Sequence, residues 1–345
     1  MITLGRGTMY HFRNMIFEGG GVKGIAYIGA LEALEKQKIL PQITRVGGTS
    51  AGAINAVLLA TGYSIEEMKK ILWELDFNKF KDGGASRAWR LVRKYGLYKG
   101  DFFYNWMREL IEAKAGNPDC TFQDLHQLAG TRSLYLVGTN LSTHFAEIFS
   151  HEHTPNMSVA NAARISMSIP LFFTAKKVMK QDIGRTAVYV DGGLLNNYPV
   201  KMFDRGGYVE NPIYLRKVPY YSKSNESSGD NPYIYNQETL GFRLDSQAEI
   251  ATFTGSDPKY NKIHNIVSYI GALKDTLMEM QESNHLHSDD WHRTIYIDTL
   301  GVKTTEFNLS DNKKNALIAS GSAGVEKYFS WFDTAENAYN KQITT

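Results

Sequence analysis

The sequence predicts an α/β protein with a mostly parallel central sheet. Two short apolar strands, residues 15–17 and 43–46, are each followed by a glycine-rich turn and then by an apolar helix. A strand–turn–helix order that repeats in this way is typical of parallel strands joined by helical crossovers. The composition agrees with a globular protein, because 43% of the 345 residues are hydrophobic and 21% are charged.

The other elements are predicted from hydrophobic periodicity, capping residues and chain breakers. The helix of the first unit begins at about Ile25, and Pro41 ends it. Further helices are expected at residues 51–61, 64–75, 101–115, 121–125, 158–167, 263–280 and 310–332. Further strands are expected at residues 133–139, 146–150, 187–190, 240–244 and 293–298.

We expect a single domain over residues 1–345. The motifs that carry chemistry fall within residues 14–205. An irregular insertion is expected at about 205–260, because it contains a Ser/Asn/Gly-rich stretch, followed by a helical and strand extension at 260–340.

Charge and cysteine content exclude some classes of protein. The net charge of +2 gives no basic footprint, so we expect no nucleic-acid partner. The single Cys120 cannot form an intrachain disulfide, which is compatible with a reducing compartment. No signal peptide and no apolar stretch of the ~20 residues needed to span a membrane is seen. We therefore expect a cytoplasmic protein; peripheral membrane association and export without a cleavable signal stay open.

The second glycine turn contains a candidate nucleophile. Its sequence Gly48-Thr49-Ser50-Ala51-Gly52 has the G-x-S-x-G pattern of a nucleophile elbow. In such an elbow a serine occupies a strained turn between a strand and a helix, and its hydroxyl projects into a cleft. Glycines two residues on either side allow neighbouring backbone to approach where a Cβ would clash. We interpret Ser50 as the nucleophile of a serine hydrolase.

The first glycine turn, Gly19-Gly20-Gly21-Val22-Lys23-Gly24, formally matches the dinucleotide-binding fingerprint. That interpretation requires a carboxylate at the end of the second strand, and residues 46–48 provide none. A better interpretation is a nest of backbone N–H groups that holds a developing oxyanion. The alternative is a tight turn without a ligand.

A serine hydroxyl needs a positioned base. None of the nine histidines lies in a recognisable catalytic motif. Asp191 is the better candidate, because it ends a strand and precedes Gly192-Gly193; the alternative is a turn-forming Asp-Gly pair. His285, His287 and His292, near two aspartates, match no standard metal spacing, so a solvated loop is favoured and no metal is expected.

Four ordered blocks together resemble the patatin-like phospholipase family. They are the glycine run 19–24, the elbow 48–52, the segment 166–172 and Asp191-Gly192-Gly193. The resemblance covers about residues 14–200 and is looser in the last third of the chain. It implies a three-layer α/β/α sandwich with a mostly parallel central sheet. Lys23 stands where many family members carry arginine.

The resemblance also implies the chemistry of the site. It implies a Ser50–Asp191 dyad without histidine, and oxyanion-hole amides from Gly20, Gly21 and Val22, with Ala51 as a further donor. It implies hydrolysis of fatty-acyl esters of phospholipids or lysophospholipids through an acyl-enzyme, with no cofactor. An activator or a homo-oligomer is a further expectation. The motif is completed by supporting residues: Gly19, Lys23, Gly24, Gly48, Gly52, Gly192 and Gly193.

Two other functions stay open. The same dyad would serve an acyltransferase or a general carboxylesterase or thioesterase, and a non-catalytic lipid-binding or regulatory module is an alternative of another class. Residues 89–95 mix basic and aromatic side chains. This pattern suits a segment that meets anionic lipid headgroups, and equally an ordinary helix whose apolar side faces the core.

Overall fold

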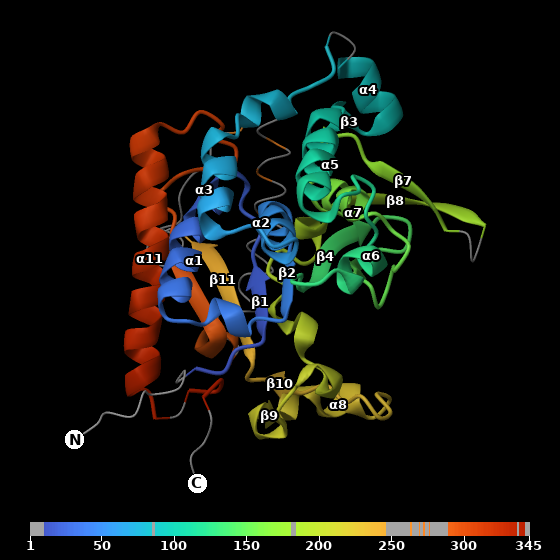
Figure 1. The fold of residues 1–345 in the computed structure, drawn as a ribbon. Helices are drawn as coiled ribbons and strands as arrows, with labels where there is room; N and C mark the ends of the chain where they lie inside the picture. The colour runs from blue at the N-terminus through green and yellow to red at the C-terminus, as the bar shows by residue number, and fades with distance from the viewer. Residues whose placement is uncertain are drawn as a thin grey trace.

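The protein is built around an eight-stranded mixed sheet (Figure 1). The computed structural model describes residues 10–84, 87–180, 184–245, 289–336 and 338–341, together with 263, 269, 272 and 276. The strand order is β12-β11-β1-β2-β4-β8-β7, and β5 pairs with β4 beside this path. The pairs from β12 to β4 are parallel, and those of β4 with β5 and β8 and of β8 with β7 are antiparallel.

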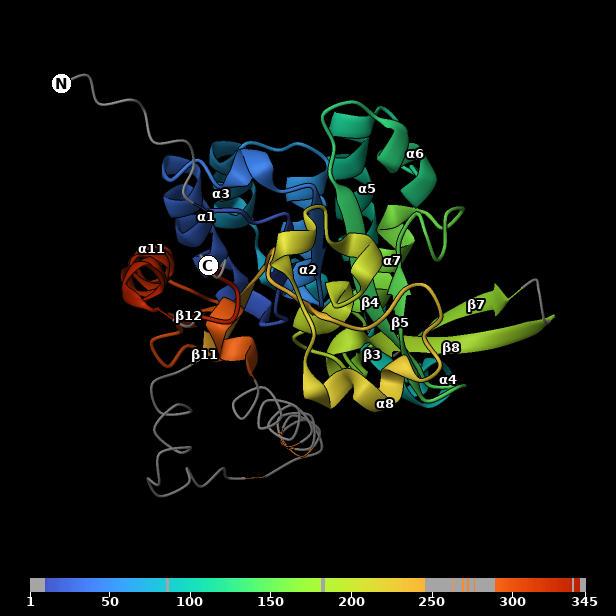
Figure 2. The same cartoon turned by 90° about the horizontal axis from the view of Figure 1, so that it is seen from below.

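The sheet strands are β1 (Asn14–Phe17), β2 (Arg45–Gly48), β4 (Ser133–Asn140), β5 (Phe145–Phe149), β7 (Lys176–Lys180), β8 (Arg185–Asp191), β11 (Thr239–Asp245) and β12 (Thr294–Asp298). Two small pairs lie outside the sheet: β3 (Gly96–Tyr98) with β6 (Leu171–Phe173), and β9 (Leu215–Arg216) with β10 (Tyr235–Asn236). The β7–β8 hairpin extends away from the body of the protein in both views (Figures 1 and 2).

The helices are α1 (Ala26–Lys36), α2 (Ala51–Ala60), α3 (Ile65–Glu74), α4 (Arg87–Lys94), α5 (Asp101–Ala115), α6 (Phe122–Gln127), α7 (Val159–Ser166), α8 (Ser222–Asn225) and α11 (Asp311–Thr334). Local sequence explains several boundaries. Ser64 and Glu67 form a capping box at the start of α3, and Gly116 ends α5 in the left-handed conformation. Ser310 accepts the Lys313 N–H and so caps α11.

Side chains of the strands alternate between the two faces of the sheet. Met15 and Phe17 enter the large core with α1, α2 and α11, whereas Ile16 packs on the other face with Val200 and Phe203. The second face is therefore covered by the short helical turns of residues 198–208. α11 lies alongside α1 (Figure 1). A Cβ added at Gly29 would come within 1.7 Å of the Ile318 carbonyl oxygen, so this close contact requires glycine.

The predicted α/β class with a mostly parallel sheet is confirmed. The strand predicted at 240–244 is present as β11, which lies inside the range expected as an insertion and pairs with β1 in the central sheet. Phe242 of β11 is fully buried and stacks on Phe17, with ring centroids 5.2 Å apart. Most of the helix predicted at 263–280 lies outside the described residues. Within the described part of the chain, no helix is long and apolar enough to cross a membrane. The single-domain organisation stays a prediction.

Candidate active site

Ser50 lies on a sharp turn between β2 and α2. Its φ of +53° and ψ of −121° belong to a conformation that L-residues rarely adopt. The turn depends on its glycines, because a Cβ at Gly52 would come within 2.4 Å of the Phe17 carbonyl oxygen. Ser50 is buried at the N-terminus of α2, where backbone N–H groups favour a negative charge. The predicted elbow geometry is therefore present in the structure.

The segment that follows α7 packs directly on Ser50. The Ser50 N–H donates to Ser166 Oγ at 3.0 Å. The Ser50 hydroxyl lies 3.6 Å from Met167 Sδ. The backbone N–H of Asp191 donates to the Ser168 carbonyl oxygen at 2.9 Å. Residues 166–168 thus contact both the candidate nucleophile and the candidate base.

Strand register places Asp191 level with Ser50. Gly48 pairs with Leu136 of β4, and Gly138 of β4 pairs with Asp191 of β8. Ser50 follows Gly48 by two residues, and Gly138 follows Leu136 by two residues. Because Asp191 pairs with Gly138, the turn that carries Ser50 and the end of β8 lie at the same edge of the sheet. Asp191 is buried, and its Oδ1 accepts the Gly193 N–H at 2.7 Å.

Asn197 connects the glycine turn to the loop that follows Asp191. Its Nδ2 donates to Glu18 Oε1 at 3.3 Å and to the Gly19 carbonyl oxygen at 3.2 Å, and its own carbonyl oxygen accepts the Gly19 N–H at 3.1 Å. A Cβ at Gly19 would lie 2.4 Å from Asn197 Oδ1 and 3.1 Å from Ser50 Cβ, and one at Gly193 would lie 2.8 Å from the same Oδ1. Asn197 therefore lies between the two loops that approach the serine.

Glu18 anchors the glycine turn to β11. Its Oε2 accepts the Leu244 N–H at 2.7 Å, and Arg243 Nε lies 3.8 Å from its Oε1. Burial raises the pKa of Glu18 to about 7, although the Arg243 charge opposes this rise. Lys23 donates to the Leu244 carbonyl oxygen at 3.3 Å, so this side chain also anchors the turn to β11.

The glycine turn contacts the segment between β12 and α11. Gly21 has a φ of +57°, and a Cβ there would lie 2.2 Å from the Thr304 carbonyl oxygen. The Val22 N–H, a predicted oxyanion donor, donates to that same Thr304 oxygen at 3.2 Å. The Val22 amide would have to leave Thr304 before it could bind an oxyanion.

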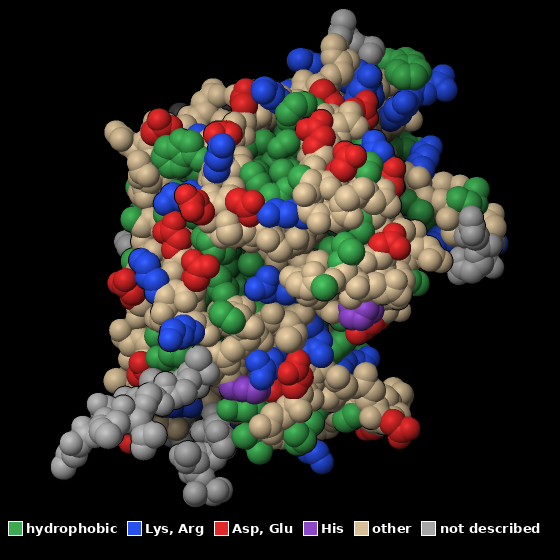
Figure 3. Space-filling view, in the orientation of Figure 1, with side chains coloured by type: hydrophobic (Ala, Val, Ile, Leu, Met, Phe, Trp, Pro, Cys, Tyr) green, Lys and Arg blue, Asp and Glu red, His purple; other side chains and the backbone are tan. Residues whose placement is uncertain are grey.

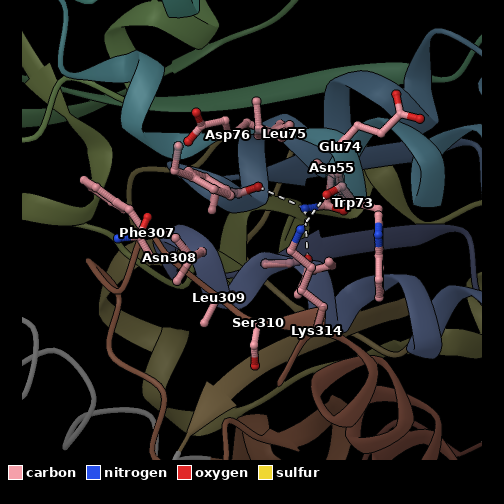
Figure 4. Close-up of a pocket in the computed structure, with 18 residues that line it drawn as sticks. Asn55, Trp73, Glu74, Leu75, Asp76, Phe307, Asn308, Leu309, Ser310 and Lys314 are labelled. Carbon is pink, nitrogen blue, oxygen red and sulfur yellow. Dashed lines mark hydrogen bonds between the residues drawn. The ribbon is translucent and has the colours of Figure 1, made fainter. Parts of the chain in front are cut away.

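A cavity of about 390 Å³ is lined by residues of the glycine turn, of α2, of α3 and of the segment that leads into α11 (Figure 4). Gly21, Val22 and Ala51 are among its lining residues, whereas Ser50 is not. The rest of its wall is mainly apolar: Ile25, Ile54, Leu72, Trp73, Leu75, Phe77, Phe307 and Leu309. Lys314 Nζ donates to the Trp73 carbonyl oxygen at 2.6 Å and links α11 to α3 across it. The size and lining suit an apolar ligand.

A buried guanidinium holds the residues around Met167 in place. Arg164 donates to Ser168 Oγ at 2.5 Å, to the Lys99 carbonyl oxygen at 2.6 Å and to the Gly100 carbonyl oxygen at 3.1 Å. It also donates to the Thr174 carbonyl oxygen at 3.1 Å. Burial lowers the pKa of Arg164 to about 10, so the group remains cationic at neutral pH.

The patatin-like phospholipase family matches residues 15–204, and this range contains all four motif blocks. The chain belongs to this family. It is 33% identical over 330 residues to the uncharacterized protein YqhO of Bacillus subtilis, covering 91% of this chain and 96% of that protein. It is 29% identical over 204 residues to the cGAMP-activated phospholipase of Escherichia coli, covering 54% and 53% of the two chains. The resemblance drawn from the motifs is thus confirmed.

Two further comparisons concern activity and fold. The chain is 23% identical over 226 residues to the probable lipid hydrolase 463L of Invertebrate iridescent virus 6, covering 64% of this chain and 68% of that one. The crystal structure of VipD from Legionella pneumophila matches with a TM-score of 0.55 at 17% identity, covering 93% of this chain and 67% of VipD. The VipD match shows that the two proteins share a fold.

The histidines considered for a metal lie elsewhere. His292 Nδ1 accepts the Tyr339 N–H at 3.1 Å, and its ring packs against Trp291 and Trp331. His285 and His287 lie outside the described residues. Among the residues that the structure describes, no group of three His, Cys, Asp or Glu side chains could hold a metal.

Sequence reasoning missed Glu18, Arg164 and Asn197. Asn197 follows Asp191 by six residues, but an asparagine at that distance predicts no contact with the glycine turn. Arg164 precedes Ser168 by one helical turn, but a basic residue at that spacing predicts nothing by itself.

Proposed function

We propose that this protein hydrolyses fatty-acyl esters of phospholipids or lysophospholipids through a Ser50–Asp191 dyad. The strained Ser50 turn is the observation that carries the proposal, because backbone strain at a buried polar residue is a mark of functional sites. The register that brings Asp191 to the same edge of the sheet supports the pairing. Membership of a phospholipase family supports the substrate class.

In the proposed mechanism Asp191 accepts the Ser50 proton while the hydroxyl oxygen attacks the ester carbonyl carbon. The tetrahedral oxyanion is held by backbone N–H groups of Gly20, Gly21 and Ala51, and by Val22 once it has left Thr304. Each such donor contributes about 2.7–4 kcal/mol in a serine hydrolase. The intermediate expels the alcohol, which takes up the proton, and leaves an acyl-Ser50 ester. Water, deprotonated by Asp191, then releases the fatty acid and restores the serine.

We further propose that the cavity holds the acyl chain. Ala51 is next to Ser50 in the chain, and Gly21 and Val22 belong to the proposed oxyanion loop, so three lining residues of the cavity are neighbours of the proposed reacting groups. Its Leu75, Phe77 and Phe307 side chains offer an apolar wall that a fatty acid would bury.

Leu75→Trp is expected to shorten the cavity. Hydrolysis of a long-chain ester should then lose about tenfold or more in kcat/KM, while a short-chain ester is hydrolysed as before, because we expect only a long acyl chain to extend to Leu75 in the cavity wall. Rates on a series of esters of increasing chain length measure the effect. Leu128→Trp, at an exposed position outside the cavity, is the matched control. Equal losses on short and long esters would contradict the assignment.

The proposed nucleophile is tested with a serine-reactive fluorophosphonate. We expect the probe to label Ser50, identified by peptide mass, and to leave Ser50→Ala unlabelled. This measurement does not require that the correct substrate or an activator be known, which matters because one relative is named as cGAMP-activated. A folded protein whose Ser50 stays unlabelled would favour the non-catalytic lipid-binding module.

A further inference from the structure

Helix α4 exposes large apolar side chains to solvent and buries a charged one. Trp89 and Val92, one helical turn apart, are 59% and 75% exposed, and Tyr95 just beyond the helix is 50% exposed. Arg90 is buried instead, and its guanidinium donates to the carbonyl oxygens of Gly83 and Leu97. A surface helix normally turns its apolar side toward the core. Trp89 and Val92 of α4 therefore face solvent, whereas Leu91 is half-buried and the buried Arg90 fixes the helix in place.

The surroundings of these apolar side chains are basic. Arg87, Arg93 and Lys94 are exposed on α4, and the chain from residue 87 to 98 contains no aspartate or glutamate. Lys177 of β7 is also exposed and lies 5.7 Å from the Tyr95 ring. Figure 3 shows hydrophobic side chains at this end of the molecule flanked by Lys and Arg side chains. We call these residues the α4 surface: Arg87, Trp89, Val92, Arg93, Lys94, Tyr95 and Lys177.

The α4 surface is attached to the segment that contacts Ser50. The Ala175 N–H donates to the Lys94 carbonyl oxygen at 3.2 Å, and Gly96 pairs with Leu171. Leu171 is exposed and only four residues beyond Met167, which touches the Ser50 hydroxyl. The surface thus adjoins the edge of the sheet at which the serine lies.

A row of aromatic rings also leads from this surface to the cavity. Phe172 contacts Tyr98, with ring centroids 4.7 Å apart, and Phe307, at 5.8 Å. Phe307 lines the cavity and stacks on Phe77 at 6.1 Å. Arg87 of the α4 surface lies over the Tyr98 ring, 5.2 Å from its centroid, so this row of rings connects the α4 surface to a wall of the cavity.

We propose that the α4 surface docks the protein on an anionic lipid bilayer. Exposed aromatic and aliphatic side chains surrounded by cations suit an acyl–headgroup boundary, and the excess of positive charge complements anionic headgroups. Interfaces between proteins are enriched in Trp, Tyr and Arg and depleted in lysine, so these side chains alone do not distinguish a protein from a bilayer. The absence of aspartate and glutamate between residues 87 and 98 is the observation that favours an anionic bilayer. This proposal rests on the proposed function, in which a lipid must pass from the membrane to Ser50.

The test measures binding of the full chain to vesicles. Ser50→Ala prevents hydrolysis of the vesicles during the measurement. Vesicles of phosphatidylcholine with phosphatidylglycerol are compared with phosphatidylcholine alone, at low and high salt. We expect Trp89→Ser with Val92→Ser to weaken binding about tenfold or more. Arg93→Gln with Lys94→Gln should weaken it by a similar factor on the anionic vesicles alone, and high salt should remove that difference.

The matched controls are Ile213→Ser and Lys223→Gln. Ile213 is 52% exposed and Lys223 is exposed on α8, at the end of the molecule opposite α4 (Figure 1). Both controls should bind as the parent does. With Ser50 restored, the α4 variants should hydrolyse a short soluble ester at the parent rate, which shows that the fold is intact.

The outcomes separate the docking from the chemistry. The docking proposal is overturned if the parent does not bind the vesicles. It is also overturned if the α4 variants bind them as well as the parent does. Variants that change the oligomeric state in solution but not vesicle binding would also overturn it and indicate a protein interface. Failure of the parent to hydrolyse any ester would instead overturn the proposed function, because vesicle binding is measured without catalysis.

Discussion

Replacing Asp191 by asparagine is expected to reduce ester hydrolysis by about 10²–10⁴-fold or more, the usual contribution of a general base. The substitution is a sharp test because asparagine keeps an Oδ1 that accepts the Gly193 N–H, a bond of 2.7 Å in the structure. The loop after β8 should therefore keep its conformation while the proton acceptor is lost. Steady-state rates on a short soluble ester, with thermal unfolding as a check on the fold, measure the effect.

Ser50→Ala is the reference for this variant. Loss of the nucleophile should cost on the order of 10⁶ in kcat, as in a well-studied serine protease. The two changes together should cost little more than Ser50→Ala alone, because both remove one chemical unit. Asp191→Asn protein whose Ser50 still reacts with a fluorophosphonate at the parent rate would show that Asp191 only shapes the loop.

The fold was largely predictable because its central units are local. The strands at β1 and β2 and the helices after them are visible as apolar runs bounded by glycine, and α3, α5 and α11 have capping residues that mark their ends. The position of β11 in the sheet was not predictable, because pairing between Phe17 and Phe242 spans more than 200 residues of the chain. β7 was missed because its sequence, Lys176 to Lys180, is mostly charged.

The reactive groups of the candidate site could be predicted, and the groups that position them could not. Ser50 and Asp191 lie in short motifs whose spacing reflects a turn, so sequence alone proposes them. Asn197 and Glu18 act through contacts between separate loops, and no local pattern reveals such contacts. The orientation of helix α4 could not be predicted either. Its composition suits a helix whose apolar side faces the core and equally one whose apolar side faces solvent, and only the buried Arg90 distinguishes the two.

Arg164→Met is expected to be the most damaging change outside the proposed dyad. The Arg164 guanidinium donates to three backbone carbonyl oxygens and to Ser168 Oγ, and methionine would remove all four of these hydrogen bonds. The Lys99 oxygen would keep only the Thr174 hydroxyl as donor, and the Gly100 oxygen only the Tyr104 N–H. Each such loss costs about 1–3 kcal/mol, so the free energy of unfolding should fall by about 3–5 kcal/mol. The turnover of the protein that remains folded should also fall, by about 10–100-fold, because Ser166 and Met167 next to Ser50 would shift.

Arg132→Met is the matched control for this prediction. Arg132 likewise donates to three backbone carbonyl oxygens, those of Leu40, Ile43 and Leu59, but it lies before β4, at the edge of the sheet opposite Ser50. Denaturant unfolding should show a loss of stability for both variants, whereas kcat per folded molecule should fall only for Arg164→Met. If both variants lose the same turnover, Arg164 stabilises the fold without positioning the site. The contrast therefore separates a positioning role from a structural one.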